Sequence, residues 1–269
     1  MPRLHAAAVA VLAVALVATA TRAQQPPLSA GPLDAALVED LVAANRILAQ
    51  EGIVDGFGHV SVRHPRDRTH FVMARALAPA LVTAADLVEY DLSGVPVNLN
   101  GRAQYSERFI HAEVYRARQD VLSVVHDHSP AVVPFTVSQT PLRSVYHMAG
   151  FIGPGLPLFE IRDVAGMTEM LVGNADRGRA LAQKLGDRPA VLMRGHGVAV
   201  VGPSLPIAIG RSVYLELNAR IQAQALALGG TVTYLTPEES QKIMESGENR
   251  GYDRAWEAWK ARAMRTLVP

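Results

Sequence analysis

Residues 121–130 read Val-Leu-Ser-Val-Val-His-Asp-His-Ser-Pro, a short apolar run that ends directly in two histidines. A run of this kind, stopped by Ser-Pro, predicts a buried strand over Val121–Val125. Side chains two positions apart on an extended segment point to the same side, so His126 and His128 are expected to lie together at the end of the strand. Taken alone, the pair favours a metal site and two hydrogen-bonded loop histidines about equally.

A third histidine tips this balance toward a metal. His196 stands between Gly195 and Gly197, in a tight turn that joins two short apolar segments. Glycines on both sides let the backbone bring the ring close to other groups. Three imidazole ligands leave a divalent cation with open positions, as catalytic metal sites require. We therefore expect His196 and the histidine pair to bind one divalent metal ion.

An acidic residue elsewhere in the chain is a candidate fourth ligand. Glu107 follows Ser106, which we predict to be the N-cap of a helix over Ser106–Arg118. A carboxylate in the first turn can project past the helix end, although compensation of the helix dipole at the surface is the better explanation from the residues alone. His111 lies one turn later and is expected to have a structural role.

The rest of the pattern predicts alternating strands and helices in one domain. Helices are expected over 33–51, 175–185, 207–228 and 238–264, and strands over 59–63, 69–73, 90–94, 190–193 and 198–201. Because no repeat or internal linker interrupts this order, we predict one α/β domain over 33–269, with a mixed sheet and helices on its faces. Trp256 and Trp259 are expected to cover the core, or else to pack on a neighbouring subunit.

Composition narrows the range of functions. The 269 residues carry 26 basic and 25 acidic side chains, a net charge of +1, so nothing indicates a nucleic-acid partner. The absence of cysteine excludes disulfides, thiolate metal ligands and cysteine nucleophiles. The chain has no dinucleotide-binding fingerprint, Walker loop or serine-hydrolase elbow, and its lysines lie on charged segments. Carbon–carbon bond chemistry would therefore need a metal or an organic cofactor.

The first 23 residues have the pattern of an export signal. Arg3 precedes a run of 13 apolar residues, and Thr21-Arg22-Ala23 offers small side chains before Gln24. As a helix, this run extends about 20 Å, short of the roughly 30 Å hydrocarbon core, so cleavage is favoured over stable membrane insertion. We expect 1–23 to be a signal peptide, 24–32 a tether, and the protein to be periplasmic or secreted, with a cytoplasmic location as the alternative.

Taken in order, the motifs resemble the class II aldolase/adducin family. They are Ser106-Glu107 with His111 and Tyr115, His126-x-His128-Ser129-Pro130, and Arg194-Gly195-His196-Gly197, and the match spans about residues 33–230. The resemblance implies a three-layer α/β/α sandwich with a central mixed, largely antiparallel sheet, and a homo-oligomer, often a tetramer. It also implies one divalent metal per subunit (Zn, Mn, Fe or Co) held by the three histidines, with Glu107 as a further ligand or as the acid/base.

Departures from the sugar-phosphate aldolases of this family indicate a different substrate. Those enzymes have Gly-Asn-x-Ser where this chain has Gly58-His59-Val60-Ser61, and their Thr-x-x-Gly turn has no counterpart in residues 73–79. These segments look more like the decarboxylase branch, which acts on hydroxylated aromatic carboxylates. The resemblance thus implies decarboxylation of a hydroxylated aromatic or related carboxylic acid. The alternatives are an aldolase acting on a sugar or sugar phosphate, and a non-catalytic, adducin-like assembly protein.

A decarboxylase needs groups that bind the substrate and groups that protonate carbon. Loss of carbon dioxide leaves a carbanion-like centre whose charge a divalent metal can accept. Glu107 or His59 is expected to deliver the proton, His59 with a pKa near working pH. Arg75 offers a guanidinium for a substrate carboxylate, or else lies at the surface. The other expected substrate-binding residues are Ser61, Ser106 and His147, the last acting across a subunit interface.

Overall fold

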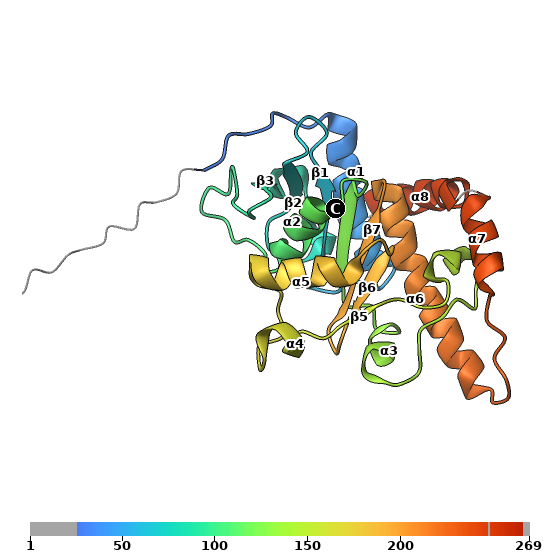
Figure 1. Ribbon diagram of the computed structural model, residues 1–269. Coiled ribbons are helices and arrows are strands. Elements are labelled where there is room, and N and C mark those ends of the chain that lie inside the picture. The colour runs from blue at the N-terminus through green and yellow to red at the C-terminus, as the bar shows by residue number, and fades with distance from the viewer. Residues whose placement is uncertain (1–25, 247, 266–269) are drawn as a thin grey trace, which may run out of the picture.

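A computed structural model describes residues 26–246 and 248–265, which form one sheet covered on both faces by helices (Figure 1). The seven strands are β1 His59–Arg63, β2 His70–Ala74, β3 Leu87–Asp91, β4 Ser123–Asp127, β5 Leu158–Phe159, β6 Ala190–Met193 and β7 Gly197–Gly202. They lie in the order β3-β2-β1-β4-β7-β6-β5, and every neighbouring pair is antiparallel except β5 and β6. The expected mixed, largely antiparallel sheet is confirmed.

The helices pack on the sheet in two layers. They are α1 Ala35–Gln50, α2 Arg108–Ala117, α3 Val133–Val137, α4 Arg162–Ala165, α5 Ala175–Leu185, α6 Leu205–Ala227, α7 Pro237–Glu245 and α8 Glu248–Arg265, with 3₁₀ turns η1 Pro79–Leu81, η2 Ala84–Asp86 and η3 His147–Ile152. Val125 of β4 belongs to the apolar cluster of α1, α6 and α8, whereas Val124 belongs to that of α2 and α5. Because successive side chains of a strand face opposite sides, these clusters are the two cores of an α/β/α sandwich.

Some element boundaries differ from the sequence-based expectation. The expected helix over 238–264 is wrong, because the structure divides this region into α7 and α8. Helix α7 ends at Glu245 and α8 begins at Glu248, and the sequence between them contains a glycine, a residue type that disfavours a helix interior. Trp256 of α8 is buried in the core, which supports the first of the two roles expected for the tryptophans. Strand β5 was not expected, since two residues carry no readable alternation.

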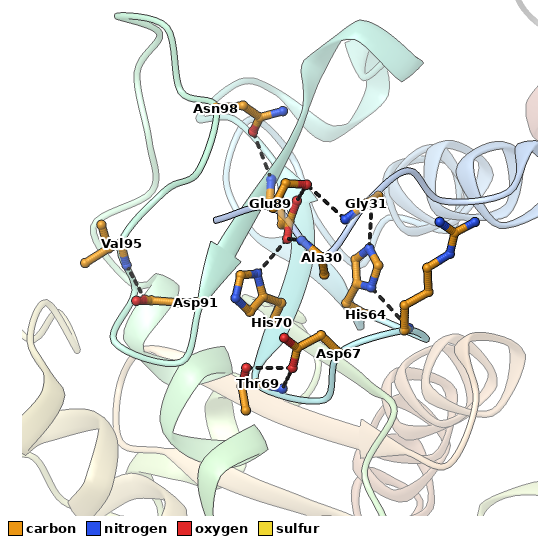
Figure 2. Close-up of polar contacts among 12 residues, drawn as sticks. Ala30, Gly31, His64, Asp67, Thr69, His70, Glu89, Asp91, Val95 and Asn98 are labelled. Atoms are coloured by element: carbon orange, nitrogen blue, oxygen red, sulfur yellow. Dashed lines mark hydrogen bonds and ion pairs between the residues drawn. The ribbon is translucent and has the colours of Figure 1, made fainter. Parts of the chain in front are cut away.

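The segment before α1 is attached to the edge of the sheet through Glu89 of β3 (Figure 2). The Ala30 N–H donates to Glu89 Oε1 at 2.7 Å, and the Ser29 hydroxyl donates to Oε2 at 2.6 Å. His70 Nδ1 of β2 lies 2.6 Å from the same Oε1. The buried carboxylate therefore joins this segment to two strands.

The expected signal peptide, residues 1–23, lies outside the described residues. Within the part of the chain that the structure describes, no helix combines the length and apolar character needed to cross a bilayer.

Candidate metal centre

Four side chains from separate parts of the chain converge at one end of the sheet. His126 and His128 come from the end of β4 and the residue just beyond it, His196 from the turn between β6 and β7, and Glu107 from the start of α2. One ligand atom of each lies within 4.8 Å of all the others. The centroids of the three imidazole rings are 4.9–5.1 Å apart. The structure thus brings together the four residues that the sequence singled out as ligands.

Two glycines make this convergence possible. Gly197 begins β7 beside β4, and a Cβ at this position would lie only 2.0 Å from the Asp127 carbonyl oxygen. Gly195 has a φ of 60°, in the left-handed region that glycine adopts most easily. The close approach of the two strands and the tight turn together carry His196 to the histidines of β4.

The imidazole rings are oriented by hydrogen bonds on their outer side. His126 Nδ1 donates to the Val198 carbonyl, and His196 Nδ1 donates to the Met170 carbonyl, both at 3.1 Å. A neutral ring that donates from Nδ1 leaves Nε2 as an unprotonated lone pair, the form that binds metals.

The inner nitrogens of the rings are suitable donors for a cation. Among the described residues, the Nε2 atoms of His126 and His128 are buried without a hydrogen-bond partner. Buried polar atoms rarely stay unpaired, and a bound metal ion would satisfy both. The residues present therefore fit a divalent metal ion.

Glu107 faces the cluster instead of capping its helix. It occupies the N-cap position of α2, but its side chain makes no capping hydrogen bond. Its Oε1 accepts the Val172 N–H at 2.9 Å, and its Oε2 lies 3.4 Å and 3.5 Å from Nε2 of His126 and His196. The expectation that Ser106 is the N-cap is wrong, because the helix begins at Arg108, one residue beyond Glu107.

The electrostatics of the cluster keep Glu107 ionised. Burial raises the pKa of a carboxyl, but here the adjacent His126 and His196 outweigh it and hold the pKa of Glu107 far below its usual range. Glu107 is therefore an anionic, partly immobilised carboxylate with one oxygen directed at the imidazoles.

His59 of β1 lies beside His126 of the neighbouring strand β4, with which it is paired in register, and the two ring centroids are 5.1 Å apart. Burial and the neighbouring His111 and His126 hold its pKa well below the usual value for histidine. The expectation of a pKa near working pH is therefore wrong, and the ring is neutral. The cause is the position of the side chain, which is only 3% exposed and lies among other imidazoles.

Ser61 lies behind this ring. Its hydroxyl is fully buried and bonds to His111 Nδ1 at 2.6 Å and to the Tyr115 hydroxyl at 2.7 Å. The expected direct contact between Ser61 and substrate does not fit this placement, because both partners of the hydroxyl are protein side chains. His111 in turn contacts His59 Nδ1 at 2.7 Å, and burial lowers the pKa of His111 to about 3.

The other expected substrate-binding residues are more exposed. Arg75 follows β2 and pairs through Nε with Asp86 at 2.7 Å, while its two Nη atoms make no hydrogen bond to the described residues. Ser106 is exposed beside Glu107. His147 is exposed on η3, with its ring 5.0 Å from that of Tyr146, and it makes no contact with the four clustered side chains among those that the structure gives for the described residues.

Sequence reasoning missed groups that shape the site. Tyr105 packs its ring 4.5 Å from that of His59 and donates its hydroxyl to the Leu77 carbonyl at 2.5 Å, fixing the segment after Arg75. Its place directly before Ser106-Glu107 was the available signal. The Val172 N–H and the Met170 carbonyl are backbone groups that any residue would supply, so no residue type marks them.

The chain belongs to the family described as Class II Aldolase and Adducin N-terminal domain, whose sequence model matches residues 39–223. Among curated relatives, it is 34% identical to decarboxylase tropJ of Talaromyces stipitatus, over 82% of this chain and 92% of the relative. It is 32% identical to a 3,4-dihydroxyphthalate decarboxylase of Terrabacter sp., over 79% and 91%. Its fold matches an L-fuculose 1-phosphate aldolase from Glaciozyma antarctica with a TM-score of 0.72 and 23% identity, over 88% and 94%.

Proposed function

We propose that this protein is a divalent-metal-dependent carbon–carbon lyase that decarboxylates a hydroxylated aromatic or related carboxylic acid. The observation that carries the proposal is the convergence of Glu107 and three histidines, two of them with unpaired, buried Nε2 atoms. The two curated relatives described above, each matched over more than nine-tenths of its length, are named decarboxylases, which favours decarboxylation over aldol cleavage. The solved aldolases support the fold alone.

The three histidines would hold the metal, with the Glu107 carboxylate beside it. A divalent cation at this position supplies positive charge that stabilises the enolate-like charge left when carbon dioxide departs. Three imidazoles and a carboxylate suit Zn, Mn, Fe and Co alike, so the donor set does not select one of them.

We assign proton transfer to Glu107. Its Oε1 is held by the Val172 N–H, so the ionised Oε2 is the oxygen that accepts a proton from the substrate hydroxyl. The same proton then returns to the ring carbon that has lost the carboxylate. The product phenolate takes its own proton from water on release, so the overall reaction consumes one proton and releases one carbon dioxide.

We assign recognition of a substrate carboxylate to Arg75. Asp86 holds its Nε, which leaves the two Nη atoms as a pair of donors suited to a carboxylate. Burial raises the pKa of Tyr105, whereas its hydrogen bond with Leu77 and the nearby Arg75 lower it, so the guanidinium lies near Tyr105, whose ring also packs on His59.

The test is a comparison of two reactions in the metal-loaded protein. Carbon dioxide release from ortho-hydroxy aromatic acids, including 3,4-dihydroxyphthalate, is expected, with no aldehyde release from L-fuculose 1-phosphate. The reverse result would establish the aldolase alternative. Stoichiometric metal that is lost in His126→Ala is expected in either case, and its absence from the intact protein would favour an adducin-like, non-catalytic role.

We also propose that copies of the chain form a homo-oligomer in the size range of a tetramer. Phe57 is 69% exposed and Val137 is 61% exposed, large apolar surfaces that a second copy would cover. Val137 lies near Gly195, next to His196, so such an interface would border the metal centre. Light scattering coupled to gel filtration tests this, and a monomer at micromolar concentration would contradict it.

A further inference from the structure

A buried chain of hydrogen bonds runs from His59 away from the metal centre. His59 Nδ1 lies 2.7 Å from His111 Nε2, His111 Nδ1 lies 2.6 Å from the Ser61 hydroxyl, and that hydroxyl lies 2.7 Å from the Tyr115 hydroxyl. The four side chains are between 0% and 3% exposed. Their protons are therefore arranged by one another and not by solvent.

The direction of the chain is set at its far end. Burial holds the pKa of Tyr115 far above its usual range, so the phenol keeps its proton. Among the described residues, that proton has one hydrogen-bond acceptor, the Ser61 hydroxyl oxygen. The opposite direction would leave a buried phenol proton without an acceptor, which folded proteins avoid. Tyr115 therefore donates to Ser61, and the proton of Ser61 points to His111.

The direction of this hydrogen bond then determines which ring nitrogen of His111, and next of His59, carries the proton. His111 accepts at Nδ1, so this neutral ring carries its proton on Nε2 and donates it to His59 Nδ1. His59, also neutral, must carry its proton on Nε2. That nitrogen makes no hydrogen bond to the described residues, so its N–H is available to a ligand.

We propose that Tyr115, Ser61 and His111 act as positioning residues that fix His59 in the Nε2–H tautomer and present its N–H to an anionic oxygen of the substrate. The role of His59 in binding substrate rests on the proposed function, but its tautomer does not. A neutral imidazole that donates in this way binds a carboxylate or phenolate oxygen and does not deliver a net proton, because loss of its only N–H proton would leave an imidazolate.

The metal ligands have the opposite tautomer. Backbone carbonyls hold the proton of His126 and His196 on Nδ1 and leave Nε2 free for a cation. His59 lies beside His126, yet its Nε2 carries a proton and has no lone pair to offer a metal. The hydrogen-bond chain of Tyr115, Ser61, His111 and His59, here called the relay, thus gives the substrate-binding histidine a different tautomer from the metal-binding ones, although the rings are close together.

The test reads the tautomer directly. In zinc-loaded protein with ¹⁵N-labelled histidine, NMR correlation of ring nitrogens and protons is expected to show His59 with a protonated Nε2 and a bare Nδ1. The His59→Gln spectrum assigns these signals by their absence. A wild-type His59 protonated on Nδ1 would overturn the proposal whether or not the protein is a decarboxylase.

Two variants test whether the relay is what fixes the Nε2–H tautomer of His59. Tyr115→Phe removes the donor that sets the direction, and Ser61→Ala breaks the same chain one step later if the first variant does not fold. Ser61→Ala removes the hydroxyl that donates to His111, so it is expected to shift His59 toward the Nδ1–H tautomer and to lower kcat/KM about tenfold, the worth of one hydrogen bond. Tyr115→Phe leaves the Ser61 hydroxyl in place but no longer fixes its direction, so it is expected to cause a smaller shift in the same direction. Retention of the Nε2–H tautomer in both would refute the relay.

The chain offers a matched control. Tyr90 is also fully buried and stacks on the same Phe71 ring as Tyr115, but its hydroxyl has no hydrogen-bond partner among the described residues. Tyr90→Phe should leave both the His59 tautomer and kcat/KM unchanged. A response of Tyr90→Phe equal to that of Tyr115→Phe would show that loss of any buried hydroxyl in this core has the same effect, and would contradict the proposal.

Discussion

At the scale of single residues, the site depends on the negative charge of the Glu107 carboxylate, which only a few atoms hold in place. The Glu107 carboxylate has one oxygen fixed by a backbone N–H and the other facing two imidazole nitrogens. Its charge therefore persists in a buried setting that would otherwise neutralise it. Under the proposed function, this arrangement would let one side chain support the metal site and also exchange a proton with the substrate.

Glu107→Gln tests whether Glu107 both supports the metal site and exchanges a proton with the substrate. The amide oxygen can still accept the Val172 N–H, so the fold and the three imidazoles remain, but the side chain can no longer exchange a proton. We expect kcat to fall by about 10²–10³ while most of the bound metal is retained. Carbon dioxide release and metal analysis of the same sample measure the two effects. Glu169→Gln, a change of an exposed carboxylate paired with Arg177, is the control, and undiminished turnover in Glu107→Gln would exclude the assigned role.

Asp86 gives a pH-dependent prediction. Burial raises its pKa, but hydrogen bonds from Thr83 and Arg75 outweigh this and leave the pKa below its ordinary value. A depressed folded-state pKa adds stability that is fully present above the unfolded value and is lost as pH falls through the folded one. Asp86→Asn should therefore cost about 1–2 kcal/mol near neutral pH.

The difference between the two proteins should shrink as the pH falls below the ordinary pKa of an aspartate, about 4, and on through the lower folded-state pKa, because the wild-type carboxyl then becomes protonated. Urea unfolding at several pH values measures it. Asp176→Asn, at a side chain that is 89% exposed, should show no difference at any pH. A cost for Asp86→Asn that stays constant over the range would contradict the linkage.

At the scale of elements, local patterns predicted most of the fold. The bounds of β1, α5 and β6 match the expected ranges, because each has a clear apolar pattern bordered by a turn or a glycine. The predicted start of α2 was wrong. Serine is the usual N-cap, and the local sequence gives no sign of the tertiary contacts between Glu107 and the histidines. Helices α7 and α8 were predicted as one helix, because both are polar and charged and no change of pattern separates them.

The site was predictable in part. The cluster of four candidate ligands could be predicted from three histidines and an acid in recognisable motifs, but the hydrogen-bond chain from His59 to Tyr115 could not. His111 and Tyr115 share a face of α2 through their four-residue spacing, yet Ser61 and His59 lie on β1, and their meeting depends on how the helix packs on the sheet. The polarity of the relay depends further on which groups lack other partners, and that is a property of the folded core alone.

The contact between α2 and α5 is the element-scale feature on which Glu107 depends. A Cβ at Gly178 of α5 would lie 2.5 Å from the Phe109 carbonyl oxygen of α2. Gly178→Ala should force the helices apart and lower the free energy of unfolding by about 1–3 kcal/mol, despite the better helix propensity of alanine. Because Val172 lies just before α5 and holds Glu107, metal affinity should also decrease.

Gly173→Ala is the matched control for this change. A Cβ there has nothing within 4 Å, so stability and metal binding should stay within about 0.5 kcal/mol of wild type. Urea unfolding and a competitive chelator titration measure the two quantities. Equal behaviour of the two variants would show that the close approach of α5 to α2 does not position the carboxylate.

At the scale of the whole molecule, segments outside the family match complete the two-layered core. The match covers residues 39–223, yet α8 contributes the buried Trp256 and packs against α1 and α6. At the other end, Ser29 and Ala30 bond to the buried Glu89. Helix α8 covers α1 and α6, and the N-terminal segment bonds to the edge strand β3, so the folded unit is larger than the part that the family model matches.

The N-terminal attachment leads to a prediction about processing. We propose that export removes residues 1–23, so that the mature chain starts at Gln24, a few residues before Ser29. A chain that starts at Gln24 keeps the bonds of Ser29 and Ala30 to Glu89, and its stability should equal that of the full chain. A chain that starts at Pro32 leaves this buried carboxylate short of two donors and should lose about 1–3 kcal/mol. Urea unfolding compares the chains, and mass spectrometry of exported protein identifies the first residue; equal stability of all three chains would show that the segment contributes nothing to the folded unit.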